Sequence, residues 1–502
     1  MRMDFRGLNG WALAAGLLAM VVGAAWAGDQ PQWGERWTRN MVSPEAGLPE
    51  SFKPDSSEHL LWSVPLGDGS YSSPIVAEGK ILIGSNNTKP QDPRHQGDRG
   101  VMQCLNEKDG SFLWQLVVPR IGGDQYLDWP GIGICSEPTV EDGLAYLMTN
   151  RTEVVCLDLD GLADGNDGPY VEEGRHMTPA EDPPMEPGPF DADIVWLCDL
   201  RAAVGVYPHD SPHTSILVDG DYLYLNTCNG VDNTHVKIRA PEAPALIVLE
   251  KKTGRVVARD REGMAPRTFH STWSPPAMGE VNGQRLVFFG GPDGVCYAFK
   301  ALTSPVPDTM QTLECVWRFD CDPSAPKENI HEYSKNVREG PSEIVAMPVF
   351  YKKRVYVVAG GDVWWGKRQA WLKCIDPAGT GDVTKTAELW SYSIPRQCFS
   401  TPAITNGLVF VGDDSGVVHC VDAETGEGYW THDVGRAIWS SALAADGKIY
   451  MGARSGVMTV FAAEKTLSVL FDTRFPDEIN ATPTAANGVL YIATRGALYA
   501  FR

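Results

Sequence analysis

The sequence is short of positive charge, and its longest run of basic residues, Lys352-Lys353-Arg354, has only three members in 502 positions. It has 43 Lys and Arg against 64 Asp and Glu, which gives a formal net charge of −21 at pH 7. Nucleic-acid binding draws most of its affinity from clustered Lys and Arg, because these release counterions from the phosphate backbone. The composition therefore argues against nucleic acid and anionic membrane surfaces as partners.

Cysteine motifs with a defined chemistry are missing as well. The 11 cysteines include no adjacent pair, no Cys-x-x-Cys and no Cys-x-x-Cys-His, which excludes haem c attachment and thioredoxin-type chemistry. Four of them stand directly before an aliphatic residue and then Asp or Asn: Cys104, Cys156, Cys374 and Cys420. A small residue that recurs at one strand position is typical of a core filler, and we favour this interpretation over a redox or metal role.

Apolar runs of membrane-spanning length are absent after the N-terminus. There, Arg2 and Arg6 precede an apolar stretch at 11–25, and Ala25-Trp26-Ala27 is a small-x-small cleavage site. We therefore predict a cleaved signal peptide at 1–27 and a periplasmic or secreted protein without a transmembrane anchor. An uncleaved anchor is the alternative. The first cysteine is Cys104, so no lipobox cysteine follows the cut.

A repeat organises the remaining sequence. Ser400, Gly407 and Gly416 recur 40 positions later at Ser440, Gly447 and Gly456, and a third copy follows from 481. Each unit is interpreted as four short strands: a Ser-x-Pro start, an Asn-Gly or Asp-Gly hairpin, an alternating apolar string, the Cys-apolar-Asp strand, and a final strand that ends on a large apolar residue. Four strands per unit at this period are typical of a propeller blade.

The repeat units number eight by two independent counts. First strands begin at Ser73-Pro74, Glu137-Pro138, Pro212 to Ser215, Ser274-Pro275, Met347-Pro348, Thr401-Pro402, Ser440-Ser441 and Thr482-Pro483. Fourth-strand anchors are Trp62, Trp114, Trp196, Val257, Trp317, Trp390, Trp430 and Leu470. We predict an all-β, eight-bladed β-propeller of four-stranded antiparallel blades at 59–502, with a lead-in segment at 28–58 and an insertion at 158–195. Trp62 precedes the first unit and the last unit stops after three strands, so the N-terminal strand is expected to complete the last blade and close the ring.

The string Gly-x-Val-x-Cys-x-Asp-x-x-Thr-Gly-x-x-x-Trp at 416–430 resembles the pyrroloquinoline-quinone (PQQ)-like β-propeller repeat family, of the quinoprotein alcohol dehydrogenase-like superfamily, which includes BamB-like assembly factors. The resemblance covers about residues 60–502. It implies either a binding or assembly platform, as in the BamB-like members, or a periplasmic PQQ-dependent dehydrogenase of alcohols or sugars with PQQ and calcium. The dehydrogenases would be expected to carry a vicinal disulfide over the quinone. Because no adjacent Cys pair exists here, we carry over no catalytic residue and no established cofactor, and we favour the platform.

Long insertions are expected on one face of the ring. The second-to-third strand loops at 86–100, 229–244 and 361–370 and the connectors between blades emerge together there. Polar and aromatic side chains precede the first strands at the channel mouth: His209, His213, His270, Trp273, Arg338, Arg396, Arg436 and Trp439. Arginines with stacking indoles suit a small anionic or quinone-like ligand, so we predict a ligand site or a protein-binding face at this mouth, on a monomer. Channel-lining groups that satisfy one another are the alternative. Trp364-Trp365 is either a stacking platform or a capping cluster.

An acidic run opens the 158–195 insertion. Its candidate calcium ligands are Asp158, Asp160, Asp164, Asn166 and Asp167, because several oxygens on a bent, glycine-rich backbone suit a hard cation. The spacing departs from that of an EF-hand loop. An Asx-turn at Asp158, which holds the turn position of the repeat, explains part of the pattern without a metal.

Overall fold

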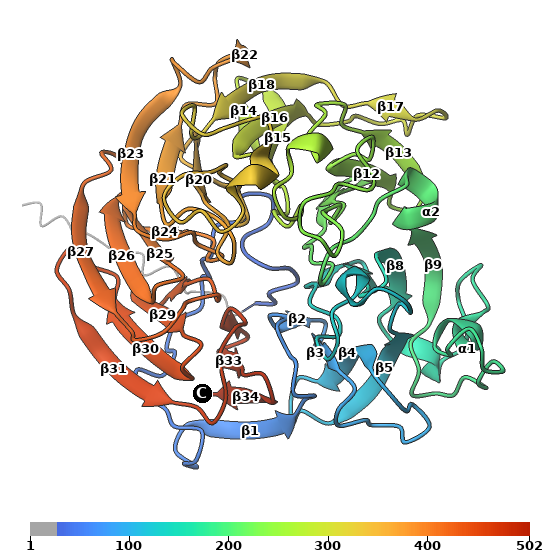
Figure 1. Ribbon diagram of the computed structural model, residues 1–502. Helices are drawn as coiled ribbons and strands as arrows, with labels where there is room; N and C mark the ends of the chain where they lie inside the picture. The colour runs from blue at the N-terminus through green and yellow to red at the C-terminus, as the bar shows by residue number, and fades with distance from the viewer. Residues whose placement is uncertain (1–27) are drawn as a thin grey trace, which may run out of the picture.

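The computed structural model of the protein describes residues 28–502 (Figure 1). The signal peptide predicted at 1–27 lies outside the described residues. Eight sheets stand in a ring around a central channel, and each has the four-stranded antiparallel order that the repeat predicts. The eight-bladed propeller is therefore confirmed, and each first strand follows one of the eight predicted starts directly or after one residue.

The strands are numbered in chain order, and each blade is named by its place along the chain. From the channel outward, blade one is β2 (Ile75–Ala77), β3 (Lys80–Asn86), β4 (Arg99–Asn106) and β5 (Phe112–Pro119); blade two is β6 (Thr139–Glu141), β7 (Leu144–Met148), β8 (Glu153–Asp158) and β9 (Ile194–Asp199); and blade three is β10 (Leu217–Asp219), β11 (Tyr222–Asn226), β12 (Leu246–Glu250) and β13 (Val256–Arg259). Blade four is β14 (Ala277–Val281), β15 (Gln284–Gly290), β16 (Val295–Lys300) and β18 (Cys315–Asp320), and blade five is β19 (Val349–Tyr351), β20 (Arg354–Gly360), β21 (Ala370–Ile375) and β23 (Glu388–Ile394). Blade six is β24 (Ala403–Thr405), β25 (Leu408–Gly412), β26 (Val417–Asp422) and β27 (Gly428–Asp433), and blade seven is β28 (Leu443–Ala445), β29 (Lys448–Gly452), β30 (Val457–Ala462) and β31 (Val469–Arg474).

The chain's own first strand closes the ring. Blade eight is β32 (Thr484–Ala486), β33 (Val489–Ala493) and β34 (Ala497–Phe501), with β1 (Leu60–Pro65) as its outer strand. Strand β1 runs antiparallel to β34, with Trp62 opposite Ala500 and Val64 opposite Leu498, and Figure 1 shows the two side by side. The closure that was predicted from Trp62 is thus confirmed, and it leaves no open edge between the ends of the propeller.

Neighbouring blades are joined by a repeated tryptophan contact. The Nε1–H of Trp390 donates to the carbonyl of Ala423 over 3.1 Å, and Trp430 makes the same bond to Glu464 in the next blade. The Thr-Gly turn of the repeat makes room for the indole. Gly426 has φ +76°, and a Cβ there would lie 2.7 Å from the Trp390 ring. The glycine of the motif therefore serves both the turn and the packing between blades.

Three of the third-to-fourth strand loops also reach back to the outer edge of the preceding blade. In parallel pairs, β17 (Gln311–Thr312) adds to β13 and β22 (Gly381–Asp382) adds to β18. Asp191, in the 158–195 insertion, forms a parallel bridge with Gln115 of β5. These additions cover outer strands that would otherwise expose unpaired backbone groups.

The remaining regular elements are short helices in loops. They are η1 (Gln125–Leu127), η2 (Gly161–Ala163), α1 (Glu173–His176), α2 (Leu200–Val204), η3 (Ala265–Arg267) and η4 (Ile330–Tyr333). Within residues 28–502, no helix has the length and apolar character needed to cross a membrane. All 11 cysteines are free, and the four of the repeat (Cys104, Cys156, Cys374 and Cys420) are fully buried in strands, as expected of core fillers.

The lead-in segment crosses the central channel and contacts the first strand of every blade. Its backbone pairs with β2 through Gln30 and with β28 through Val42. Arg39, which is fully buried, donates to the carbonyls of Pro276, Trp33 and Ser215. The other contacts are Pro31 with Val140, Trp37 with Val218 and Met278, Thr38 with Phe350, Asn40 with Ile404, and Ser43 with Ala444 and Ala485. The segment thus fills the channel from within.

Candidate functional site

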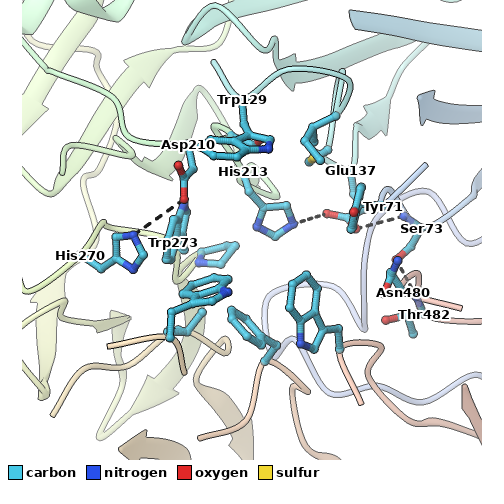
Figure 2. A pocket seen from close by; sticks show the side chains of 18 of the residues that line it. Tyr71, Ser73, Trp129, Glu137, Asp210, His213, His270, Trp273, Asn480 and Thr482 are labelled. Carbon is cyan, nitrogen blue, oxygen red and sulfur yellow. Dashed lines mark hydrogen bonds and ion pairs between the residues drawn. The ribbon is translucent and has the colours of Figure 1, made fainter. Parts of the chain in front are cut away.

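A cavity of about 520 Å³ opens where the first strands begin, at the mouth of the channel. Its wall combines strand starts such as Ser73, Glu137 and Thr482 with side chains from the connectors and from the loops at 229–244 and 361–370. Trp33 of the lead-in segment also lines it. Figure 2 shows the labelled side chains turned toward a common space. The cavity therefore lies on the face where the sequence predicts the long insertions.

Aromatic rings make up most of the cavity wall. Edge contacts hold them in place: Trp364 lies 5.9 Å from Trp273 and 6.1 Å from Trp439, measured between ring centroids, and both pairs are T-shaped. Nine aromatic residues line the cavity: Trp33, Tyr71, Tyr126, Trp129, Trp273, Trp364, Trp365, Phe399 and Trp439. Such a wall can stack flat rings or hold a cation over ring faces.

The charged groups of the cavity lining are carboxylates. Glu137 accepts a hydrogen bond from the backbone N–H of Ser73, and its second oxygen lies 3.1 Å from Nε2 of His213 (Figure 2). Asp210 is the other acidic residue of the wall. No Lys or Arg of the described chain belongs to the lining. The lining is therefore mainly apolar and has acceptor groups, and the Arg454 guanidinium stacks on the Trp439 ring, 3.8 Å from its centroid, without belonging to the lining.

Asp362 anchors the tryptophan loop at 361–370. Its Oδ1 accepts the backbone N–H groups of Trp364 and Trp365, at 3.0 and 2.6 Å. Its Oδ2 lies 2.8 Å from Nδ1 of His270. Burial alone would raise the pKa of Asp362, but His270 and these backbone donors lower it below the usual value. The loop is thus fixed to the neighbouring blade by one buried carboxylate.

Three histidine rings meet behind Trp364 and Trp365. His209 lies 4.8 Å from His270 and 4.9 Å from His235, measured between ring centroids. One nitrogen from each ring lies within 4.8 Å of those of the other two. Burial, followed by the neighbouring His270 and His235, lowers the pKa of His209 to about 2, so this imidazole is neutral. Burial raises the pKa of the adjacent Asp210 to about 6.

The structure gathers five of the eight predicted ligand residues at this site. His213, His270, Trp273 and Trp439 line the cavity, and His209 packs directly behind it against Tyr126.

The three arginines are placed elsewhere. Arg396 pairs with Asp414 over 2.8 Å, and Arg338 is exposed on its connector. Arg436 is exposed in a shallow depression with Arg454 and Glu478. The ligand role of these eight residues remains a prediction, but the arginine fork expected for an anion does not face the cavity.

Several lining residues were not found from the sequence. His235 and Asp210 lie in loops outside the repeat, and Glu137 occupies the position where most other blades have a serine or threonine and blade five has Met347. The glutamate of the Glu137-Pro138 pair is therefore the one signal in the repeat that indicates a charged side chain at the start of a first strand. Tyr126 and Trp129 come from the connector between blades one and two, which is not part of the repeat pattern.

Only some of the predicted calcium ligands of the insertion lie close together in space. Carboxylate oxygens of Asp158, Asp160 and Asp164 lie within 4.8 Å of one another. Asp160 pairs with Lys80 over 2.9 Å, and Asp158 accepts the backbone N–H of Asp160 in the expected Asx-turn. The side-chain amide of Asn166 donates a hydrogen bond to Glu173, and the backbone N–H of Asp167 donates one to the carboxylate of Asp193. Calcium at this loop remains a prediction.

The cavity does not suit the quinone cofactor of the family's dehydrogenases. PQQ is a tricarboxylate, and a buried carboxylate needs cationic partners. The wall instead presents Glu137 and Asp210 and no Lys or Arg among its described residues. Arg396, one of the predicted arginines, is already paired with Asp414. These residues therefore do not form a site for that group.

Comparison with known proteins agrees with the fold. Residues 368–469 and 415–501 match the family model described as "Outer membrane protein assembly factor BamB". The crystal structure of BamB from Moraxella catarrhalis superposes with a TM-score of 0.52 at 13% identity, covering 88% of this chain and 99% of that one. The computationally designed Ika8 protein superposes with a TM-score of 0.50 at 12% identity and the same coverage. No curated protein matches the chain.

The solved structures are too distant in sequence to show more than the fold. The family model matches from blade five to blade eight, where the repeat is most regular. Together with the repeat string at 416–430, this match shows that the C-terminal blades are similar to the PQQ-like β-propeller repeat family.

Proposed function

We propose that the protein is an exported binding protein that holds a flat organic group, neutral or positively charged, in the cavity at the channel mouth. The observation that carries this proposal is the composition of the wall, which has nine aromatic residues and two carboxylates and, among residues 28–502, no lining Lys or Arg. Concave, mostly apolar sites with a few convergent polar groups are the usual form of small-molecule sites. Ring faces and carboxylates together favour cations.

The same observation disfavours the quinone-dependent dehydrogenase and the small anionic ligand. Both would bring carboxylates against Glu137 and Asp210, and like charges at close range in a partly buried site cost several kcal/mol. The binding role is therefore the better supported of the two that the family resemblance implies.

A matched series of probes tests the charge preference. Benzyltrimethylammonium, benzyl alcohol and benzoate share one ring and differ in charge, and their affinities are measured by calorimetry and tryptophan fluorescence. We expect the cation to bind best and benzoate worst. Trp364→Ala should weaken all three, and Glu137→Gln should reduce only the advantage of the cation. Arg436→Ala, outside the cavity, is the control. Preferential binding of benzoate, or an effect of Arg436→Ala as large as that of Trp364→Ala, would refute the proposal.

A protein partner at the same face is the second candidate. Its support is a set of exposed apolar side chains on loops of this face: Val236 (51% exposed), Val337 (49%) and Trp364 (47%). The first two flank the tryptophan loop, because the N–H of Arg368 donates to the carbonyl of Val337, and His235 packs on Trp365. Exposed apolar groups around a cavity are typical of interaction surfaces.

Site-specific crosslinking tests the second candidate. A photoreactive amino acid at Val337 should give one discrete adduct in cells. The same group at Leu470, which is also exposed (44%) but lies on the outer strand β31, should give none. Equal adducts at both positions would show that the face has no selective partner.

A further inference from the structure

We propose that His209, His235, His270 and Asp210 form a binding site for a divalent transition-metal ion of the Zn²⁺ class. The proposal is independent of which group the cavity binds. It rests on ring positions, on three buried polar atoms without partners, and on the hydrogen bonds that fix the rings from behind.

Three unpartnered atoms converge at one point. Nε2 of His209, Nε2 of His270 and Oδ1 of Asp210 are buried and have no hydrogen-bond partner within residues 28–502. Nε2 of His209 lies 3.6 Å from Oδ1 of Asp210, and Nε2 of His270 lies 3.7 Å from Oδ2. Figure 2 shows the ring of His270 facing Asp210. A buried polar atom left without a partner destabilises the fold, so the convergence of three such atoms calls for a bound group.

The bonds on the far side of each ring show that these atoms are acceptors. Nδ1 of His209 lies 2.7 Å from the carbonyl of Val231, which accepts only, so Nδ1 carries the proton. Nδ1 of His270 faces Asp362, which already accepts the N–H groups of Trp364 and Trp365. Both Nε2 atoms therefore present lone pairs. Lone pairs of two imidazoles and a carboxylate, with no donor between them, suit a cation better than a water molecule, which has only two hydrogens to donate.

This arrangement matches that of metal-bound histidines in general. A ligating imidazole usually donates its other N–H to a carboxylate or a backbone carbonyl, which fixes the tautomer and the ring plane. Here Asp362 and Val231 provide these partners. Imidazole with carboxylate suits Zn²⁺, Cu²⁺, Ni²⁺ and Fe²⁺ rather than Ca²⁺.

His235 supplies the third nitrogen. The three nitrogens lie within 4.8 Å of one another, whereas two nitrogens bound to one ion with bonds of about 2 Å stand at most about 4 Å apart. A bound ion therefore requires small side-chain rotations, and His235 is the only one of the three rings that is half buried. His235 and Asp210 both have φ 57°, and non-glycine residues in this region cluster at ligand sites.

The backbone around the histidines is built for close approach. The loop at 229–244 is hydrogen-bonded to the connectors before blades three and four. The N–H of Gly230 donates to the carbonyl of Tyr207, and the N–H of Val231 donates to that of His270. A Cβ on Gly230 would lie 2.7 Å from Cβ of His209. Only glycine therefore lets three segments from separate parts of the chain bring their histidines together.

A second group of His and Asp side chains shows the contrast. Asp92, His95 and Asp191 also gather, but Arg94 lies 2.6 Å from Asp92 and 3.7 Å from Asp191. These carboxylates are neutralised by an arginine, whereas within residues 28–502 Asp210 faces only the imidazoles of His209 and His270 and no Lys or Arg.

Metal titration of the full protein tests the proposal. After treatment with EDTA, Zn²⁺ is titrated by calorimetry, and Co²⁺ is used as a visible-absorption probe of nitrogen ligands. We expect one Zn²⁺ per chain and Co²⁺ bands in the visible range. His235→Ala, in a half-buried loop, should lower Zn²⁺ affinity by about 100-fold or more, and Asp362→Asn, which acts through His270, by about 10–100-fold. His213→Gln, in the same cavity but directed to Glu137, should leave it unchanged.

Three results would overturn the site. The first is that no Zn²⁺ binds to the EDTA-treated protein. The second is that Zn²⁺ binds equally well to His235→Ala, and the third is that His213→Gln weakens it as much as His235→Ala does. The melting temperature of each variant, measured without metal, separates loss of the site from loss of the fold.

Discussion

The carboxylate of Asp362 lies 2.8 Å from Nδ1 of His270 and so joins the tryptophan loop of blade five to the connector before blade four. With this single contact, two segments that are 92 positions apart in the sequence form one wall of the cavity. The aromatic surface and the histidine cluster are therefore held by the same buried group.

The tautomer of His270 is predicted to depend on Asp362. In Asp362→Asn, the new amide oxygen can still accept the N–H groups of Trp364 and Trp365, so its NH₂ group faces Nδ1 of His270. We expect the ring to move its proton from Nδ1 to Nε2, as seen by ¹H–¹⁵N NMR of the labelled histidines. Asp413→Asn, beside His419, is the control and should leave His270 unchanged. An unaltered His270 tautomer in Asp362→Asn would contradict the assigned hydrogen bond.

Packing between blades is predicted to depend on the turn glycine of the repeat. Gly407 and Gly426 have nearly the same φ, +77° and +76°, but a Cβ at Gly407 meets nothing within 4 Å, whereas one at Gly426 meets the Trp390 ring. Alanine at Gly407 should cost about 1–2 kcal/mol of stability from backbone strain. Alanine at Gly426 should cost about 1–3 kcal/mol more, from overpacking. Denaturant unfolding measures the difference, and equal costs would argue against the glycine–indole contact.

The lead-in segment is predicted to stabilise the ring through Arg39. Burial lowers the pKa of this guanidinium to about 9, and its side chain donates to three backbone carbonyls and to Ser215. Arg39→Ala should lower the free energy of unfolding by about 3 kcal/mol or more, because several buried acceptors lose their donor. The exposed Arg436→Ala should change it by less than about 0.5 kcal/mol. Similar values for the two variants would show that the segment contributes little.

The free energy of unfolding is predicted to fall as the pH rises, because of the buried carboxyl group of Asp128. Burial raises the pKa of this carboxyl to about 7, although Asn150, the N–H of Ile121 and Arg120 lower it in part and Asp98 raises it. The native state therefore holds a proton that the unfolded state releases near pH 4, so the contribution of Asp128 to stability is lost as the pH rises from about 4 to 7.

Asp128→Asn removes this dependence. It should leave stability unchanged below about pH 4 and raise it above pH 7, by at most about 4 kcal/mol. Chemical denaturation at several pH values measures it, and Asp142→Asn, whose side chain is 86% exposed, controls for the lost charge. A gain that is the same at every pH would contradict the buried acid.

The ring was predictable from sequence because its determinants are local and repeated. The Ser-x-Pro starts, the turn glycines and the Trp anchors recur at fixed spacing, and strand pairing within a blade joins neighbours in the chain. The plugging of the channel was not predictable, because the segment around Arg39 and Trp33 has no repeat and binds mostly through backbone groups.

The candidate site was predicted only in part for a related reason. His209, His213, His270, Trp273 and Trp439 precede first strands, so the repeat register brings them to the mouth. Arg396 and Arg436 share that register, but side-chain direction decides their place: Arg396 turns to Asp414, and Arg436 turns to solvent. His235 lies in an insertion whose path is set by Gly230 and by contacts distant in sequence.

A crystal structure of the protein with benzyltrimethylammonium tests the central claim most directly. The binding account predicts density for the ring and the ammonium group inside the cavity, against Trp364, Trp439 and Glu137. Density only outside the cavity, or an empty cavity at a concentration that saturates the calorimetric titration, would contradict it.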